Sequence, residues 1–138
     1  PGTSKGLDLL PVETVLKAPK TTTRTRFLWK NIEGRGYEIH MGETKRLGGS
    51  ALFTIIERNL LPCQTEDGCE MYDSKFMGTY IHGMFDTPVI IREWLKTMNL
   101  NHIDVPNRNR LDEKDMAYDL LAVHFERHMN TNAIFDLI

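Results

Sequence analysis

The chain has 138 residues, of which 41% are hydrophobic and 26% are charged, and its formal net charge is -2 at pH 7. This length suffices for one domain with a buried core, and the charge argues against nucleic acid as a partner, because neutralising phosphates needs a basic surface. No apolar run is long enough to span a bilayer and no signal peptide is present, so we expect a cytoplasmic protein without a membrane partner.

Two cysteines, Cys63 and Cys69, are too few for a disulfide framework. Neither is followed by the glycine-rich turn that exposes a nucleophile between a strand and a helix. No paired-histidine motif accompanies them, which argues against zinc. We interpret both as free thiols of a reducing compartment.

The chain begins at Pro1 without an initiator methionine and runs directly into the strand-like stretch "SKGLDLLPVETV". We interpret the sequence as a piece of a longer protein and expect part of any active site to lie outside it.

β-Strands are predicted throughout the first half. Residues 7–15 are rich in β-formers, with Pro11 placing that point at an edge or a bulge. Residues 21–29, "TTTRTRFLW", predict a strand, "NIEGRG" at residues 31–36 a turn, and "YEIHMGETK" at residues 37–45 the next strand. Two strands around a glycine-containing turn indicate an antiparallel hairpin.

Alternation along the second strand of this hairpin sends Tyr37, Ile39 and Met41 to one face, and Glu38 and His40 to the other. The strand thus presents a carboxylate and an imidazole together. The residues alone leave three interpretations open: a functional site, a buried ion pair or surface decoration.

Residues 51–59, "ALFTIIERN", predict another strand, and "TEDGCE" at residues 65–70 predicts a turn. A strand at residues 76–81 then ends at His82, where the block "GTYIHGMFD" leaves the imidazole uncrowded by small neighbours. Such a histidine is either a packing or turn residue, or a general acid–base at a strand end.

The second half changes to helical spacing. Thr87 and Pro88 provide a helix start, with a cap residue followed by proline in the first turn. A last helix is expected from Asp112 to about His128, with acidic residues at its positive end. The apolar stripes of these two helices are Ile91, Trp94, Leu95 and Met98 in the first, and Met116, Leu120 and Val123 in the last. Strands first and helices last predict the later part of an α/β domain.

His124 and His128 lie four residues apart on the last predicted helix, a spacing at which two imidazoles can share a metal. No third ligand accompanies them, so we predict no metal site. His102 lies in a connector and carries no signal.

Three blocks occur in order along the chain, "GLDLLPVETV", "GYEIHMGET" and "GTYIHGMFD". Together they resemble the C-terminal glutamine amidotransferase domain of cobyric acid synthases, a family of vitamin B12 biosynthesis, and the closing "YDLLAVHFERHMN" is similar to the end of that domain. The resemblance covers nearly the whole chain, from Gly6 to about Ile134. It implies that residues 1–138 are the C-terminal part of a class I, flavodoxin-like α/β amidotransferase domain.

In that family a cysteine on a nucleophile elbow attacks the side-chain amide of glutamine, and a histidine on a later strand activates the thiol and protonates the leaving ammonia. The resemblance places this catalytic histidine at His82, with Gly83 leaving room for the partner loop. Tyr37, Glu38 and His40 fall in the second block, which implies a place near the glutamine-side pocket.

The chain departs from the family in two ways. The family's nucleophile lies upstream of the first block, and neither Cys63 nor Cys69 has its context, so we expect the nucleophile segment and the ATP-using synthetase domain to be absent. Met84 stands where typical triad amidotransferases have a glutamate. The corrinoid branch also lacks that glutamate, so His82 is oriented by backbone or by another group, for which Asp86 is one candidate.

The resemblance implies a parent enzyme that amidates corrinoid carboxylates, with glutamine as nitrogen source and with ATP and Mg in the absent synthetase domain. No cofactor is expected in this chain, which alone is expected to be inactive, and an unpaired sheet edge favours its self-association. The alternatives are cobyrinic acid a,c-diamide synthase, another amidotransferase of the same branch, or a non-catalytic interaction module with the same fold.

Overall fold

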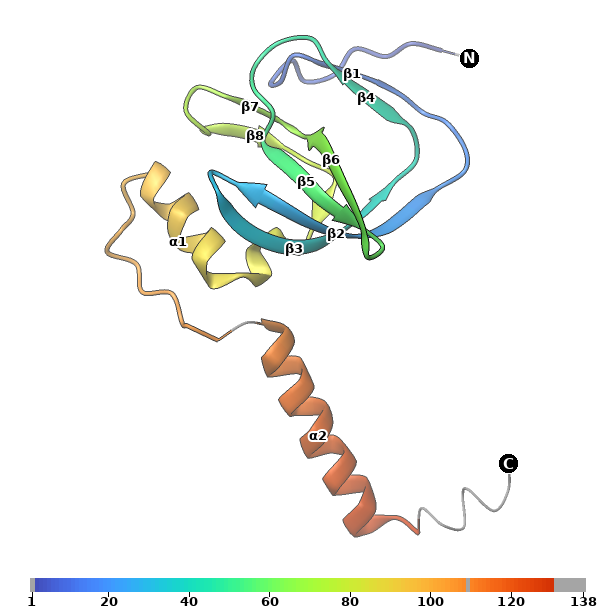
Figure 1. Cartoon of the computed structure of the whole chain (residues 1–138), viewed down its shortest axis with the longest axis vertical. Coiled ribbons are helices and arrows are strands. Elements are labelled where there is room, and N and C mark those ends of the chain that lie inside the picture. The colour runs from blue at the N-terminus through green and yellow to red at the C-terminus, as the bar shows by residue number, and fades with distance from the viewer. Residues whose placement is uncertain (1, 109, 131–138) are drawn as a thin grey trace. The chain divides into compact units, whose positions relative to one another are not determined.

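A computed structural model describes residues 2–108 and 110–130 of the chain, which forms two compact units, Pro1–Val105 and Pro106–Ile138. The first unit contains the described strands and the helix α1. The second contains the helix α2, Arg110–His128 (Figure 1). No described helix is long and apolar enough to cross a membrane.

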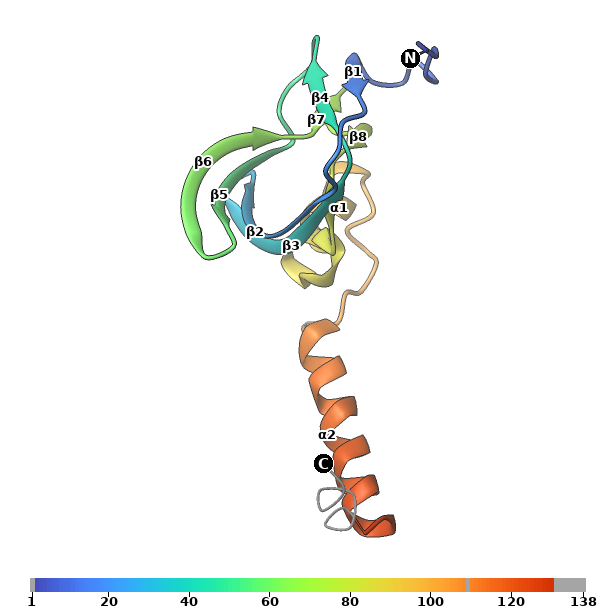
Figure 2. The same cartoon turned by 90° about the vertical axis from the view of Figure 1, so that its right-hand side faces the viewer.

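The main sheet of the first unit has five antiparallel strands in the order β6-β5-β2-β3-β9. Figure 2 shows that this sheet is strongly curved. Its strands are β2 (Thr21–Trp29), β3 (Ile32–His40), β5 (Phe53–Arg58), β6 (Leu61–Asp67) and β9 (Ile81–His82).

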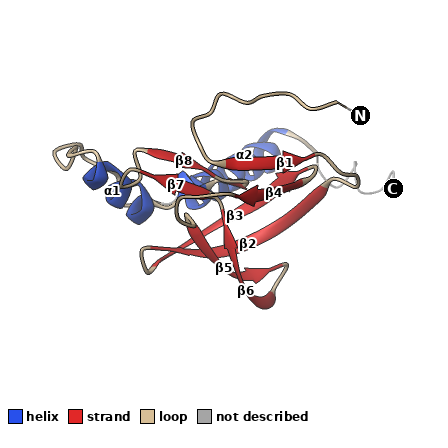
Figure 3. Cartoon of the chain, turned by 90° about the horizontal axis from the view of Figure 1, so that it is seen from above, coloured by secondary structure: helices blue, strands red, loops and turns tan. Residues whose placement is uncertain are grey.

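Two smaller antiparallel pairs accompany the main sheet, as the view from above shows (Figure 3). One joins β1 (Val12–Val15) to β4 (Glu43–Arg46), and the other joins β7 (Cys69–Met71) to β8 (Phe76–Gly78). After β9 the chain forms a short 3-10 helix, Met84–Asp86, and then α1, Pro88–Thr97.

The core of the first unit lies on one face of the main sheet. Alternate residues of β2 and β5 are fully buried there, and the rings of Phe27 and Phe53 meet at 4.4 Å between centroids. Side chains that follow β9 complete this cluster, which comprises Phe27, Trp29, Leu52, Phe53, Ile55, Ile81, Met84 and Ile90. The cluster therefore joins Ile81 of β9 to the buried side chains of β2 and β5 on this face of the sheet.

Several sequence predictions are confirmed. The strand at residues 21–29 has the predicted bounds, and it forms the predicted antiparallel hairpin with the next strand. The helix α1 begins at Pro88 after Thr87, and α2 ends at His128. The α/β order, with strands first and helices last, agrees with the class I, flavodoxin-like amidotransferase fold implied by the resemblance.

The prediction of a turn at residues 31–36 is wrong, because the turn is only Lys30 and Asn31, both with positive φ. Gly34 and Gly36 lie inside β3 instead. A Cβ on Gly34 would lie 2.4 Å from the Phe27 ring, and a Cβ on Gly36 would lie 2.4 Å from the carbonyl oxygen of His82. These glycines therefore mark close approach of neighbouring groups and not a change of direction.

Three other boundaries differ from the prediction. The expected turn at residues 65–70 is largely strand, since β6 continues to Asp67 and the hairpin turn is Asn59 and Leu60. The expected strand at residues 37–45 breaks at Gly42, where a Cβ would lie 2.3 Å from the carbonyl oxygen of Val15. The strand expected at residues 76–81 is split between β8 and β9, and that expected at residues 7–15 is confined to β1.

The predicted helix stripes are only partly buried. In α1, Leu95 is buried but Met98 lies beyond the helix and is 37% exposed, whereas Ile90 is fully buried. The buried side of α1 is thus rotated from the predicted stripe. In α2, by contrast, the predicted stripe is exposed at Met116, Leu120 and Val123, and the unit has no other described helix or strand.

We expect Gly36→Ala to destabilise the first unit by about 3 kcal/mol, because the new methyl group meets the backbone of β9, which has no flexible end to move. Urea unfolding of the two proteins measures the difference. Gly48→Ala is the matched control, since its Cβ would meet nothing nearer than the Pro11 ring at 3.4 Å. Equal stabilities of the Gly36 and Gly48 variants would contradict the close approach of β9 to β3.

Candidate active site

His82 is the last residue of β9, as the sequence predicted for a strand end. It pairs with Tyr37 of β3, and Ile81 pairs with Glu38. Gly83 follows with a φ of 76°, a conformation that favours glycine, and begins the 3-10 helix. Gly83 thus turns the chain sharply away after His82, and this is its visible role in the described structure.

The imidazole of His82 lies stacked on the phenol ring of Tyr37. The ring centroids are 5.2 Å apart and the planes differ by 9°. Both residues are exposed, and 44% of Tyr37 is accessible to solvent. The pair therefore presents an imidazole of fixed plane on the outer face of the sheet, open to an approaching group.

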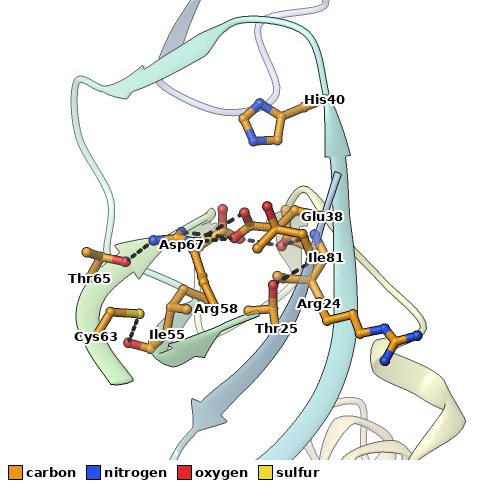
Figure 4. A network of polar contacts seen from close by, with 12 residues as sticks. Arg24, Thr25, Glu38, His40, Ile55, Arg58, Cys63, Thr65, Asp67 and Ile81 are labelled. Atoms are coloured by element: carbon orange, nitrogen blue, oxygen red, sulfur yellow. Dashed lines mark hydrogen bonds and ion pairs between the residues drawn. The ribbon is translucent and has the colours of Figure 1, made fainter. Parts of the chain in front are cut away.

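Glu38 lies on the opposite face of β3 and is only 3% exposed. Both of its carboxylate oxygens accept hydrogen bonds from the Arg58 guanidinium, at 2.9–3.3 Å (Figure 4). Arg58 also donates to the hydroxyl of Thr65 at 2.7 Å. The hydrogen bonds that Arg58 donates to Glu38 raise the pKa of Arg58, against the opposing effect of burial, so the guanidinium keeps its positive charge.

Asp67 lies at the end of β6, close to this pair. Burial raises the pKa of the Asp67 carboxyl, and the negative charge of Glu38 raises it further, while a hydrogen bond from Thr79 opposes the rise. The Thr79 hydroxyl donates to Asp67 at 2.5 Å and accepts from the backbone N–H of Ile81 at 2.9 Å. A chain of hydrogen bonds thus connects β6 to β9 behind the exposed His82.

The raised pKa of Asp67 predicts a pH dependence of stability. A carboxyl whose pKa is raised on folding binds its proton more tightly in the folded state, so its stabilising contribution is present at acid pH and is lost as the pH rises through the raised pKa. Asp67→Asn still accepts from Thr79 but cannot ionise. We therefore expect the free energy of unfolding of this variant, relative to that of the parent chain, to increase as the pH rises from about 4 to about 7. Urea unfolding at both pH values tests this, and parallel pH profiles would contradict it.

His40 is held by two contacts of its own. Its Nδ1 lies 2.9 Å from the carbonyl oxygen of Gly42, and its ring stacks on Tyr80 at 4.3 Å between centroids. The Tyr80 hydroxyl in turn is 2.5 Å from that of Thr44. His40 therefore joins β3, β4 and the segment before β9, and one of its two ring nitrogens is engaged by the backbone.

The structure does not gather the candidate residues Tyr37, Glu38, His40 and His82 into one site. It brings Tyr37 and His82 together on the outer face and places Glu38 on the inner face beside Arg58. The sequence analysis missed Arg58 and Asp67, which lie in strands without a motif, and assigned no role to Thr79 although it lies in the third block. The only available signal was a carboxylate at a buried strand position, which requires a nearby partner.

The two cysteines are free thiols, as predicted. Cys63 lies in β6 with its Sγ 3.9 Å from the carbonyl oxygen of Ile55, and Cys69 is a buried residue of β7. Neither lies in a turn between a strand and a helix. Within residues 2–108 and 110–130, no group of three or more His, Cys, Asp or Glu residues is placed to hold a metal ion.

Comparison with known families identifies the class of protein to which the chain belongs. The model of the CobB/CobQ-like glutamine amidotransferase domain matches residues 1–89, which include Tyr37, Glu38, His40 and His82. This is more than half of the chain, which therefore belongs to the CobB/CobQ-like glutamine amidotransferase family.

The more particular similarity is to proteins named cobyric acid synthase. The chain is 37% identical over 141 residues to the one from Chlorobium phaeobacteroides strain BS1, and 36% identical over 140 residues to the one from Streptococcus sanguinis strain SK36. These alignments cover 100% and 98% of the chain but 28% of each relative. The chain thus spans about a quarter of the length of these relatives. No solved structure matches it.

Proposed function

We propose that the chain is the histidine-bearing part of the glutaminase domain of an ATP-dependent, glutamine-hydrolysing corrinoid amidase of cobalamin biosynthesis. The family match and the similarity to cobyric acid synthases support this proposal. The observation that carries it is the exposed His82 imidazole, held at the end of β9 by the stacked ring of Tyr37.

In the proposed reaction His82 is the general base. Its imidazole removes the proton from a cysteine thiol, and the thiolate attacks the carboxamide carbon of glutamine. The tetrahedral intermediate collapses when the imidazolium returns this proton to the departing ammonia, leaving a thioester. Water, deprotonated by the same imidazole, then hydrolyses the thioester to glutamate and restores the thiol. The ammonia passes to the carboxylate that is to be amidated.

The thiol in this scheme is supplied by a segment other than the described strands that hold Cys63 and Cys69. Activation of the acceptor carboxylate with ATP and Mg is assigned to a synthetase domain, also outside these residues. The chain's share of the relatives' length leaves room for both. Self-association of the chain and a cytoplasmic location stay predictions.

We expect the 138-residue chain alone to show no glutaminase activity, because neither Cys63 nor Cys69 lies at an exposed turn where a thiolate can attack. Release of ammonia from glutamine by the purified chain measures this. Activity that disappears in Cys63→Ser or Cys69→Ser would contradict the expectation and would identify the nucleophile.

The proposed function is tested with the full-length protein that contains this chain, glutamine labelled with ¹⁵N in the side chain, ATP and Mg. We expect the label to enter amides of cobyrinic acid a,c-diamide. Labelling of cobyrinic acid at its a and c carboxylates would instead identify an a,c-diamide synthase. Labelling of a non-corrinoid acceptor would point to another amidotransferase of the branch. Absence of glutamine hydrolysis with every acceptor would leave a non-catalytic interaction module and overturn the proposal.

A further inference from the structure

We propose that Tyr37 is the positioning residue of His82, fixing the plane of its imidazole by ring stacking and not contacting glutamine itself. This inference rests on the proposed function of His82 as a general base. It assigns Tyr37 a role different from those of Glu38 and His40 in the second block. Glu38 pairs with Arg58, and His40 contacts the carbonyl oxygen of Gly42.

The backbone sets the position of both rings. Tyr37 and His82 are direct partners in an antiparallel pair, so their side chains leave the sheet on the same face. The neighbouring Gly36 leaves no room between β3 and β9, since a methyl group on it would overlap the carbonyl oxygen of His82. The spacing of the two rings is therefore determined by the sheet and not by chance contact of mobile side chains.

The stack restrains the rotation that matters for proton transfer. Rotation of the imidazole about the Cβ–Cγ bond would move both nitrogens away from the thiol, and a misplacement of about 1 Å costs on the order of 100-fold in rate. A neighbouring ring within 9° of parallel opposes that rotation by occupying one side of the imidazole. The His82 side chain is exposed, and its nitrogens exchange protons in the plane of the ring, which stacking on one face does not block.

The residue at which triad amidotransferases carry a glutamate cannot orient His82 here. That residue is Met84, which is 7% exposed and belongs to the hydrophobic core. Asp86 folds back over Gly83, where its Oδ2 would lie 3.1 Å from an added Cβ. Asp86 is therefore the rival candidate, and it is separated from Tyr37 by its own variant in the experiment.

Tyr37 can be changed without opening the core, because nearly half of it is exposed and it is absent from the buried cluster. Tyr37→Phe keeps the stacked ring and removes the hydroxyl. Tyr37→Leu keeps apolar bulk and removes the ring. Tyr72→Leu is the matched control, since Tyr72 is an exposed tyrosine in the turn between β7 and β8, outside the main sheet.

The first readout needs no enzyme activity. In NMR spectra of the 138-residue chain, the ring protons of His82 should be displaced by the ring current of Tyr37. We expect this displacement to persist in Tyr37→Phe and in Tyr72→Leu and to disappear in Tyr37→Leu. Unchanged His82 ring resonances in Tyr37→Leu would overturn the inference, whatever the activity of the full-length protein.

The second readout is steady-state glutaminase activity of the full-length protein. We expect Tyr37→Leu to lower kcat about 10-fold or more with KM for glutamine within about twofold, and Tyr37→Phe and Tyr72→Leu to stay within about twofold in both. A raised KM with unchanged kcat in Tyr37→Leu would make Tyr37 a glutamine contact and overturn the inference. An equal kcat loss in Tyr37→Phe, or a loss only in Asp86→Asn, would also overturn it. If the parent protein has no glutaminase activity, the proposed function fails, and the NMR readout still decides whether the stack exists.

Discussion

Replacement of His82 by alanine will lower glutamine-dependent amidation by the full-length protein by about 10²- to 10⁴-fold, the usual contribution of a general acid–base. Amidation with free ammonia will stay within about twofold of the parent, because activation of the acceptor does not use this imidazole. The ratio of the two rates at saturating acceptor is the quantity to measure. Of the two candidate histidines, His82 and His40, it is His82 that lies at the end of β9 on the exposed face with Tyr37.

His102→Ala is the matched control, since His102 lies in the connector after α1 and outside the sheet. It is expected to leave both rates unchanged. His40→Ala is the informative comparison, because His40 stacks on Tyr80 behind the strand end. Retention of glutamine-dependent turnover by His82→Ala, together with its loss in His40→Ala, would transfer the catalytic assignment to His40.

Replacement of Glu38 by alanine will destabilise the first unit by about 2 to 3 kcal/mol. Removal of one member of a buried ion pair costs roughly 3 to 5 kcal/mol, and the value here is lower because about a third of the Arg58 side chain remains exposed. The loss arises because Arg58 keeps its charge but loses the acceptor of its three hydrogen bonds to Glu38. Urea unfolding with linear extrapolation measures it.

Glu43→Ala provides the control for this prediction, because Glu43 pairs with Lys17 on an exposed surface and its loss should leave stability unchanged. The double variant Glu38→Leu with Arg58→Met replaces the pair by apolar groups and is expected to recover most of the lost stability. A different result would favour a place for Glu38 in the glutamine-side pocket. In that case Glu38→Ala would be as stable as the parent, and it would lose amidation with glutamine but keep amidation with free ammonia.

Local sequence patterns predicted the parts of the fold that depend on near neighbours. The strand at residues 21–29 alternates buried and exposed side chains, and the Thr87–Pro88 pair begins a helix. Gly34 and Gly36 were misjudged because glycine occurs both in turns and at points of close contact. What distinguishes them is the Phe27 ring and the β9 backbone lying against β3, which no local pattern contains.

The candidate site was predicted in part for the same reason. The resemblance identified His82, Tyr37 and Glu38 as residues of interest, and alternation correctly separated Tyr37 from Glu38. It could not show that β9 pairs with β3, because that pairing joins segments far apart in the sequence. Stacking of Tyr37 on His82 follows from this pairing, and pairing of Glu38 with Arg58 follows from the place of β2 between β3 and β5.

The reactivity of the nucleophilic thiol in the full-length protein tests the assignment of His82 most directly, because alkylation requires neither glutamine nor an acceptor. Only the thiolate reacts, so a histidine that removes the thiol proton accelerates alkylation near neutral pH. With iodoacetamide at pH 7 and mass spectrometry to locate the modified cysteine, we predict that His82→Ala slows alkylation of that cysteine by about 10-fold or more, while Cys63 and Cys69 react as in the parent. Equal alkylation rates of that cysteine in the parent and in His82→Ala would contradict the account.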